Sequence, residues 1–209
     1  WHSGEPPYTA FFNWLEGQGE RPASSSSPRW RSFMLAHPAT LEELSKLDPN
    51  DFVAEWKWDG IRVQVVADSN TTTLYSRTGE DITGSFPELK MPAGFVGVID
   101  GELLARRSDM ERLAPGTFND LQQRLNRKAP PQKLIEGSPV FVRAYDLLQT
   151  GEHDMRSQTT MERRQALVDV LSAVRPDFMD ASEHVEFGDV EALDRMRRLP
   201  PDAAIEGVM

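Results

Sequence analysis

The alternation of apolar and polar residues is clearest around residues 52–58, where every second position is apolar. This pattern is typical of a strand with Glu55 and Lys57 on its polar face. Asp59-Gly60 follows, and this pair is typical of a two-residue type I′ turn, which requires positive φ at both positions. We therefore predict a hairpin whose return strand covers residues 61–67.

The register of such a hairpin places Lys57 opposite Arg62 and Glu55 opposite Gln64. Two like charges directly opposed are unfavourable on an ordinary hairpin surface. A guanidinium beside an ammonium lowers the lysine pKa from its reference of about 10.4, and a lysine of lowered pKa is a nucleophile. The alternative is an amphipathic hairpin whose charged face is only solvated.

The rest of the chain mixes strand and helix patterns. Strands are predicted over residues 70–77, 95–104 and 139–148, and helices over residues 8–15, 41–47, 118–128, 162–174 and 190–199. Thr40 with Glu43 and Thr159 with Glu162 match the capping box that starts a helix. Hairpins and meanders dominate and no βαβ phosphate loop is found, so we predict an α+β fold built mainly from antiparallel strands with flanking helices.

Several polar residues stand out against this background. Asp100 and Glu102 continue a row of valines on one face of a predicted strand, and a buried carboxylate requires a hydrogen-bond donor or a metal. Arg77 precedes a Thr-Gly turn, and Tyr145 lies in an apolar strand. Each also has an alternative without a functional role. Asp100-Gly101 can form a turn, Arg77 can be a solvated charge at the surface, and Tyr145 can be a core aromatic residue. The cations that end the helix over residues 118–128 are interpreted as solvated and favourable to its dipole, in preference to contacting DNA.

Composition narrows the class of protein. The chain has 209 residues, 39% of them hydrophobic and 27% charged, which is typical of a globular domain with a real core. No apolar run approaches the ~18 residues of a membrane span, no signal peptide opens the chain, and cysteine is absent. We expect a cytoplasmic protein. The net charge of −10 argues against broad nonspecific binding of nucleic acid by this segment alone.

Residues 1–32 are rich in Pro, Gly and Ser, and we predict that they are the tail of an upstream domain followed by a linker. Residues 33–209 are predicted to be one domain. The chain begins at Trp1 and stops in an apolar run at Met209, so we expect a fragment of a longer protein.

Five short motifs, in this order, resemble those of ATP-dependent DNA ligases of the bacterial and archaeal type and of their relatives, the RNA ligases and mRNA capping enzymes. They are Lys57-x-Asp59-Gly60-x-Arg62, Ser76-Arg77-x-Gly79, Asp100-Gly101-Glu102-Leu103, Tyr145-Asp146-Leu147-Leu148 and Glu206-Gly207-Val208-Met209. The resemblance covers roughly residues 33–209. It implies an ATP-grasp-like adenylation (nucleotidyltransferase) domain, truncated before the last motif of the family and its oligonucleotide-binding domain.

The resemblance also implies a reaction. Lys57 attacks the α-phosphate of ATP to give lysyl-AMP, AMP moves to the 5′-phosphate at a nick in double-stranded DNA, and the strand is then sealed. The nucleotide contacts it implies are Glu55, Trp56, Lys57, Arg62, Arg77, Glu102, Tyr145 and Glu206. Within this set Tyr145 stacks on the adenine, and Glu102 and Glu206 hold Mg²⁺.

Other interpretations stay open at this point. An RNA ligase or a capping guanylyltransferase shares the lysine motif. NAD⁺-dependent DNA ligases share it too, but the upstream segment does not resemble their nicotinamide-recognition domain. A further alternative is a nucleotide-binding module without catalysis. The joint retention of Lys57, Arg77, Glu102 and Glu206 argues against it. We expect a monomer with no membrane association.

Overall fold

The computed structural model describes residues 8–19, 27–107, 113–125 and 127–209. Its helices are α1 (Thr9–Leu15), α2 (Leu41–Leu44), α3 (Phe118–Gln122), α4 (Gln132–Gly137), α5 (Thr160–Val174) and α6 (Val190–Arg198). Its strands are β1 (Ala54–Trp58), β2 (Ile61–Asp68), β3 (Thr71–Ser76), β4 (Gly97–Ala105), β5 (Val140–Thr150), β6 (His153–Asp154), β7 (Met179–Ala181), β8 (His184–Val185) and β9 (Ile205–Val208). Of the predicted tail and linker, residues 1–7 and 20–26 lie outside the described residues.

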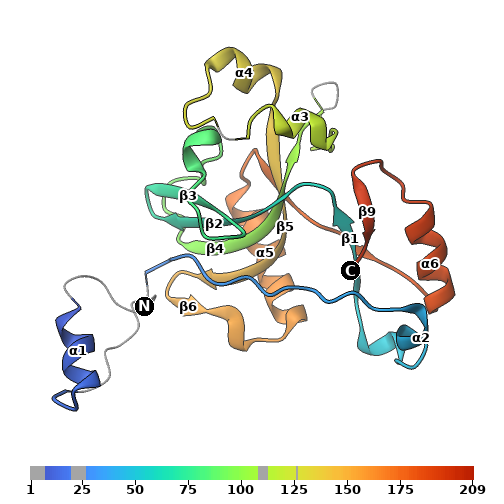
Figure 1. The fold of residues 1–209 in the computed structure, drawn as a ribbon, viewed down its shortest axis with the longest axis horizontal. Coiled ribbons are helices and arrows are strands. Elements are labelled where there is room, and N and C mark those ends of the chain that lie inside the picture. Colours follow the sequence, from blue (N-terminus) through green and yellow to red (C-terminus); the bar gives the residue numbers. More distant parts are fainter. Residues whose placement is uncertain (1–7, 20–26, 108–112, 126) are drawn as a thin grey trace.

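The large sheet has the strand order β3-β2-β4-β5-β6, and β7 pairs with β5 as its parallel member. The other neighbours run antiparallel. Helix α5 packs on one face, where Val63, Val65 and Leu103 join Leu167 in a core from which solvent is excluded. Figure 1 shows this curled sheet at the centre of the molecule. The α+β fold with mainly antiparallel strands is confirmed.

The small sheet has the order β8-β1-β9 and lies beside α2 and α6 (Figure 1). The strand predicted over residues 52–58 is therefore correct as β1, but the predicted hairpin is wrong. Lys57 pairs with Gly207, whereas Arg62 pairs with Glu102 of the large sheet. The opposed Lys57–Arg62 pair is not formed, and the expected effect of Arg62 on the lysine loses its geometric basis.

The reason lies at Asp59-Gly60. Among the described residues, the positive-φ positions do not include these two, so no type I′ turn forms. The chain instead passes from the small sheet into the large one. A Cβ at position 60 would overlap the carbonyl oxygen of Leu103 in β4. Glycine is therefore required here because two backbones approach closely. The Asp-Gly dipeptide, which favours a turn, is used here where the chain passes from one sheet to the other.

The other strand predictions are confirmed as β3, β4 and β5, and both capping boxes are formed. The helix over residues 118–128 is wrong in its second half, because α3 ends at Gln122 and residue 126 lies outside the described residues. Arg124 is not a solvated cation but fully buried. Its guanidinium pairs with Glu88 at 2.8 Å and donates to the carbonyl of Ser85 at 2.8 Å, as a buried charge requires.

The segment 29–36 crosses the face of the large sheet opposite the α5 core (Figure 1). It forms no strand; side chains of the sheet hydrogen-bond to its backbone instead. In the described part of the chain, no helix combines the length and apolar character needed to cross a membrane.

Candidate functional site

A cleft of about 500 Å³ lies where the two sheets meet. It is lined by all of the residues for which the motifs imply a nucleotide contact: Glu55, Trp56, Lys57, Arg62, Arg77, Glu102, Tyr145 and Glu206. Residues 35 and 36 of the crossing segment complete the wall. Residues as far apart in sequence as 55 and 206 thus share one cavity.

Lys57 lies on β1, and its side chain is about half exposed (47%). Its Nζ forms an ion pair with Oε1 of Glu206 on β9. Antiparallel pairing of β1 and β9, with Lys57 opposite Gly207, brings these two side chains together. The sequence indicated both residues, but the strand pairing that joins them was not predicted.

Glu55 shares a face of β1 with Lys57 and is contacted by His184 of β8, whose Nε2 lies 3.2 Å from Oε1. Burial raises the pKa of Glu55 to about 7, against a lowering effect of Arg164. Burial also lowers the pKa of His184, with Arg164 adding to the effect. The contact is therefore not a full ion pair at neutral pH, and Glu55 is able to donate as well as accept a hydrogen bond there.

Arg62 is held from several sides at the cleft wall. Its Nη1 donates to the carbonyl of Met34 at 2.6 Å, and Nη2 lies 3.6 Å from Oδ2 of Asp100. Its guanidinium carbon is 4.6 Å from the centre of the Phe33 ring and 5.6 Å from that of Tyr145. Contacts of this kind fix the orientation of a planar cation, which suits Arg62 for binding a phosphate or a carboxylate.

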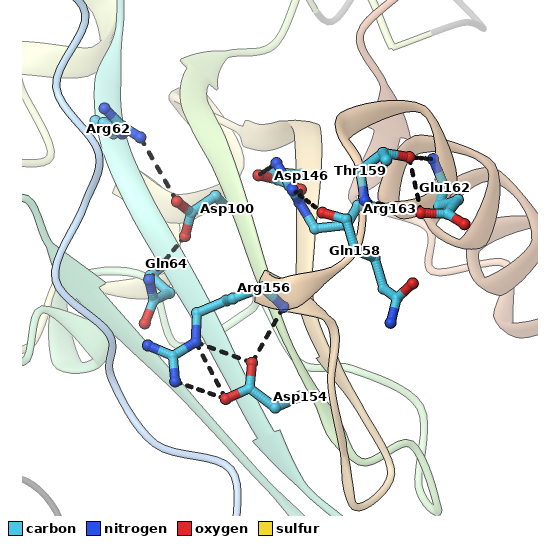
Figure 2. A network of polar contacts seen from close by, with 10 residues as sticks. All are labelled: Arg62, Gln64, Asp100, Asp146, Asp154, Arg156, Gln158, Thr159, Glu162 and Arg163. Atoms are coloured by element: carbon cyan, nitrogen blue, oxygen red, sulfur yellow. Dashed lines mark hydrogen bonds and ion pairs between the residues drawn. The ribbon is translucent and has the colours of Figure 1, made fainter.

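The two carboxylates of β4 have different surroundings. Burial raises the pKa of Asp100 to about 6 and that of Glu102 to about 7, while the charge of Arg62 lowers both. Asp100 accepts a hydrogen bond from Nε2 of Gln64 at 2.7 Å, as Figure 2 shows. The expected donor for a buried carboxylate is thus present at Asp100, and Glu102 faces the cleft.

Tyr145 and Arg77 enter the cleft from irregular backbone. In the pairing of β4 with β5, Asp100 faces Asp146 and Gly101 faces Ala144, so Tyr145 is the extra residue of a bulge. Bulges redirect a side chain, and burial raises the pKa of this phenol. Arg77 is exposed at the rim, next to the predicted turn at Gly79, whose φ is +82°.

Sequence reasoning missed four residues around the site: Phe33, Met34, Gln64 and His184. A signal existed for Gln64, which is a polar residue between Val63 and Val65 and shares the face of Arg62 on the strand. For the two segment residues no periodic pattern exists, because they contact the sheet through a backbone carbonyl and a ring face.

The described residues contain no group of three or more His, Cys, Asp or Glu side chains arranged to hold a metal ion. Glu102 and Glu206 nevertheless line the same cleft from different sheets. Mg²⁺ is commonly bound by one or two carboxylates together with substrate phosphates and water. The two glutamates fit that donor set when a nucleotide supplies the phosphate oxygens.

Comparison with known proteins gives a consistent family. The sequence model described as "ATP dependent DNA ligase domain" matches residues 33–209. DNA ligase 2 of Methanosarcina mazei is 32% identical over 162 residues, which are 74% of this chain and 28% of the relative. A probable DNA ligase of Anaeromyxobacter sp. is 35% identical over 149 residues, which are 69% of this chain and 27% of the relative.

Two solved structures share the fold. The ligase domain of LigD from M. tuberculosis superposes with a TM-score of 0.56 at 25% identity, over 75% of this chain and 46% of that one. A mycobacterial DNA ligase D complexed with ATP and MES gives a TM-score of 0.58 at 25% identity, over 79% and 49%. The chain spans less than a third of these two curated relatives. The matches confirm the resemblance drawn from the five motifs.

Proposed function

The chain belongs to the ATP-dependent DNA ligase domain family, and on that premise we propose that it is the adenylation domain of a DNA ligase that forms lysyl-AMP at Lys57. One observation carries the proposal: all eight residues for which the motifs imply a nucleotide contact line the same cleft between the two sheets. A solved relative of 25% identity is described as complexed with ATP, which supports ATP as the nucleotide.

In the proposed reaction, the Nζ–Pα bond forms, the bond from Pα to the pyrophosphate oxygen breaks, and the amine loses its proton. The attacking amine must be neutral and in line with the leaving group. Lys57 must therefore leave its ion pair with Glu206 before it attacks. Arg62 and Arg77 offset negative charge on the phosphoryl oxygens, with Arg62 already oriented by its contacts.

The remaining residues bind the nucleotide. Tyr145 offers an aromatic face to the adenine, and Glu55, able to donate or accept near neutral pH, reads the base or the ribose together with the neighbouring Trp56. Glu102 and Glu206 would hold Mg²⁺, which supplies charge stabilisation at the phosphates.

We further infer that the activated AMP passes to the 5′-phosphate of nicked double-stranded DNA in the full-length protein. With a net charge of −10, this chain is unsuited to holding DNA by its phosphates alone. Contacts from other parts of a longer protein are therefore expected. A monomer acting in the cytoplasm remains our proposal, and sedimentation of the full-length protein tests its oligomeric state.

Intact-mass spectrometry tests the adenylation step. Full-length protein incubated with ATP and Mg²⁺ is expected to gain one AMP, and Lys57→Ala is expected to gain none. Nicked DNA is expected to be sealed in preference to nicked RNA, and ATP to be used in preference to GTP. The reverse preferences would instead identify an RNA ligase or a capping enzyme. AMP on the Lys57→Ala protein at the wild-type level would refute the proposal.

A further inference from the structure

A buried amide of the large sheet binds the backbone of the segment 29–36. Gln64 of β2 is fully excluded from solvent. Its Oε1 accepts a hydrogen bond from the backbone N–H of Arg31 at 2.6 Å, and its Nε2 donates to the carbonyl of Arg31 at 3.2 Å. The side chain thus pairs with both backbone groups of one residue, as a neighbouring strand would.

The same amide also contacts the charged side of the site. Nε2 of Gln64 donates a second hydrogen bond, to Oδ1 of Asp100 at 2.7 Å. The other carboxylate oxygen of Asp100 lies 3.6 Å from Nη2 of Arg62 (Figure 2). Both amide protons and the amide oxygen of Gln64 are therefore engaged, and an uninterrupted polar chain joins the segment to Arg62.

The segment reaches Arg62 a second time, directly. Two and three residues after Arg31, the Phe33 ring lies 4.6 Å from the guanidinium carbon and the Met34 carbonyl accepts from Nη1 at 2.6 Å. The next residues, Leu35 and Ala36, line the cleft. The position of the segment on the sheet therefore determines the positions of Phe33 and Met34, which contact Arg62, and of one wall of the cleft.

We propose that Gln64 is a positioning residue, which orients Arg62 toward the nucleotide by fixing both Asp100 and the segment 29–36. This inference rests on the proposed nucleotide site. Gln64 itself does not line the cleft, so its effect on the nucleotide is transmitted through Arg62 and the segment. Loss of the amide removes the hydrogen bond to Oδ1 of Asp100 and both hydrogen bonds to the Arg31 backbone, so that Asp100 and the segment hold the Arg62 guanidinium less firmly.

The test measures equilibrium binding of α,β-methylene-ATP, which cannot transfer AMP, to the full-length protein. Gln64→Leu is expected to raise Kd about tenfold, the size expected from losing a hydrogen-bonded contact to a charged group. In an Arg62→Lys background, the same substitution is expected to change Kd less than twofold, because Gln64 acts through Arg62. Circular dichroism and thermal unfolding establish that each variant is folded.

Gln149→Leu is the matched control. Gln149 is a glutamine of the same sheet, 1% exposed, and it accepts from the Arg31 side chain at 3.1 Å. This substitution removes a buried amide but leaves Gln64 with Asp100 and the Arg31 backbone. We expect stability to fall and Kd to change less than twofold.

Each outcome decides a separate question. Equal Kd values for wild type and Gln64→Leu, or equal losses in Gln64→Leu and Gln149→Leu, would refute the positioning role. A full additional tenfold loss in the Arg62→Lys background would also refute transmission through Arg62. Wild-type protein that binds the analogue but forms no lysyl-AMP with ATP would refute the proposed function alone. Wild-type protein that does not bind the analogue would refute both.

Discussion

The two sheets are built in different ways. In the large sheet, β2 and β3 are consecutive strands joined by a short turn, and β4 and β5 follow in order along the chain. Its core side chains, such as Val63 and Leu103, have no exposed surface. In the small sheet, β1 pairs with segments more than 120 residues further along the chain. Apolar side chains near it stay exposed, among them Leu41 (46%) and Phe52 (51%).

The site combines the two. Arg62, Glu102 and Tyr145 come from the large sheet, whereas Lys57 and Glu206 come from the small one. The six residues from Lys57 to Arg62 therefore bridge two sheets and are not one hairpin. The well-buried sheet thus holds three of the proposed nucleotide contacts, and the less buried one presents the proposed nucleophile. Local stability is expected to differ in the same sense, because it follows the extent of apolar burial.

The largest expected contrast comes from shortening one leucine in each region. Leu103→Ala empties space in the fully buried core of the large sheet and is expected to cost about 3 kcal/mol of unfolding free energy. Leu41→Ala, in α2 beside the small sheet, removes a side chain that is 46% exposed and is expected to cost less than about 1 kcal/mol. Urea denaturation measures both. Equal losses would contradict the difference in packing between the two regions.

A second contrast uses one glycine in each sheet. A Cβ at Gly101 of β4 would lie 2.6 Å from Cγ1 of Val142 and 2.8 Å from the carbonyl oxygen of Arg143. Gly101→Ala is therefore expected to cost about 2 kcal/mol through overpacking against a backbone that cannot move freely. At Gly207 of β9 the nearest atom would be Cβ of Lys57, at 4.0 Å. Gly207→Ala is expected to be nearly neutral in thermal unfolding, and a large loss there would show that the small sheet is as tightly packed as the large one.

The same difference explains which features the sequence predicts. Alternation identified β1, a largely apolar run identified β5, and capping boxes identified the starts of α2 and α5, because these signals depend on neighbouring residues. Pairing of β1 with β9 depends on contacts 149 residues apart, and no local pattern records it. Asp59-Gly60 was misread because glycine permits both a positive φ and a close backbone approach, and only the tertiary structure shows which is used.

For the site, the motifs predicted the residue types but not the partners of each side chain. All of the residues implied by the motifs line one cleft, which their order along the chain does not reveal. Arg62 was expected beside Lys57 and is held instead by Met34, Phe33 and Asp100. A backbone carbonyl and a ring face from an irregular segment leave no periodic signal, so these contacts could not be derived from sequence patterns.

The pH dependence of stability can be tested with one carboxyl group from each sheet, Glu55 and Asp154, whose pKa values are shifted in opposite directions. Burial raises the pKa of Glu55, in the small sheet, from 4.5 to about 7. The folded state thus holds this proton more tightly, so the contribution of Glu55 is greatest below pH 4.5 and is lost as pH rises to about 7. Glu55→Gln is expected to make the fall in stability across this window shallower, by on the order of 1–3 kcal/mol.

Asp154 of the large sheet gives the opposite control. Hydrogen bonds from Arg156 lower its pKa from 3.8 to about 2, so its contribution is present above pH 3.8 and is lost as pH falls toward 2. Asp154→Asn is expected to leave the slope between pH 4.5 and 7 unchanged. Urea midpoints measured across both windows check this, and an unaltered slope in Glu55→Gln would contradict the raised pKa.

A small effect on stability is expected at the ion pair between β1 and β9 of the small sheet, both members of which line the cleft. Lys57 and Glu206 are 47% and 45% exposed, and pairs in water contribute at most about 1 kcal/mol. Glu206→Gln is therefore expected to shift the unfolding midpoint little. Lysyl-AMP formation is expected to fall more than tenfold, because the same carboxylate contacts the proposed nucleophile and is a proposed Mg²⁺ ligand. A functional loss without a structural one would separate the role of Glu206 from that of a residue that only joins two strands.

Glu42→Gln is the matched control for that separation. It breaks an exposed ion pair, 3.0 Å long, between Glu42 of α2 and Lys46, which follows the helix; neither residue lines the cleft. Both substitutions remove one negative charge from a solvent-exposed pair, so any general effect of net charge on folding or on ATP attraction appears equally in each. Lysyl-AMP formation that falls in Glu206→Gln and not in Glu42→Gln assigns the loss to the cleft. Equal rates in the two variants would mean that Glu206 takes no part in the reaction and only balances the charge of the resting lysine.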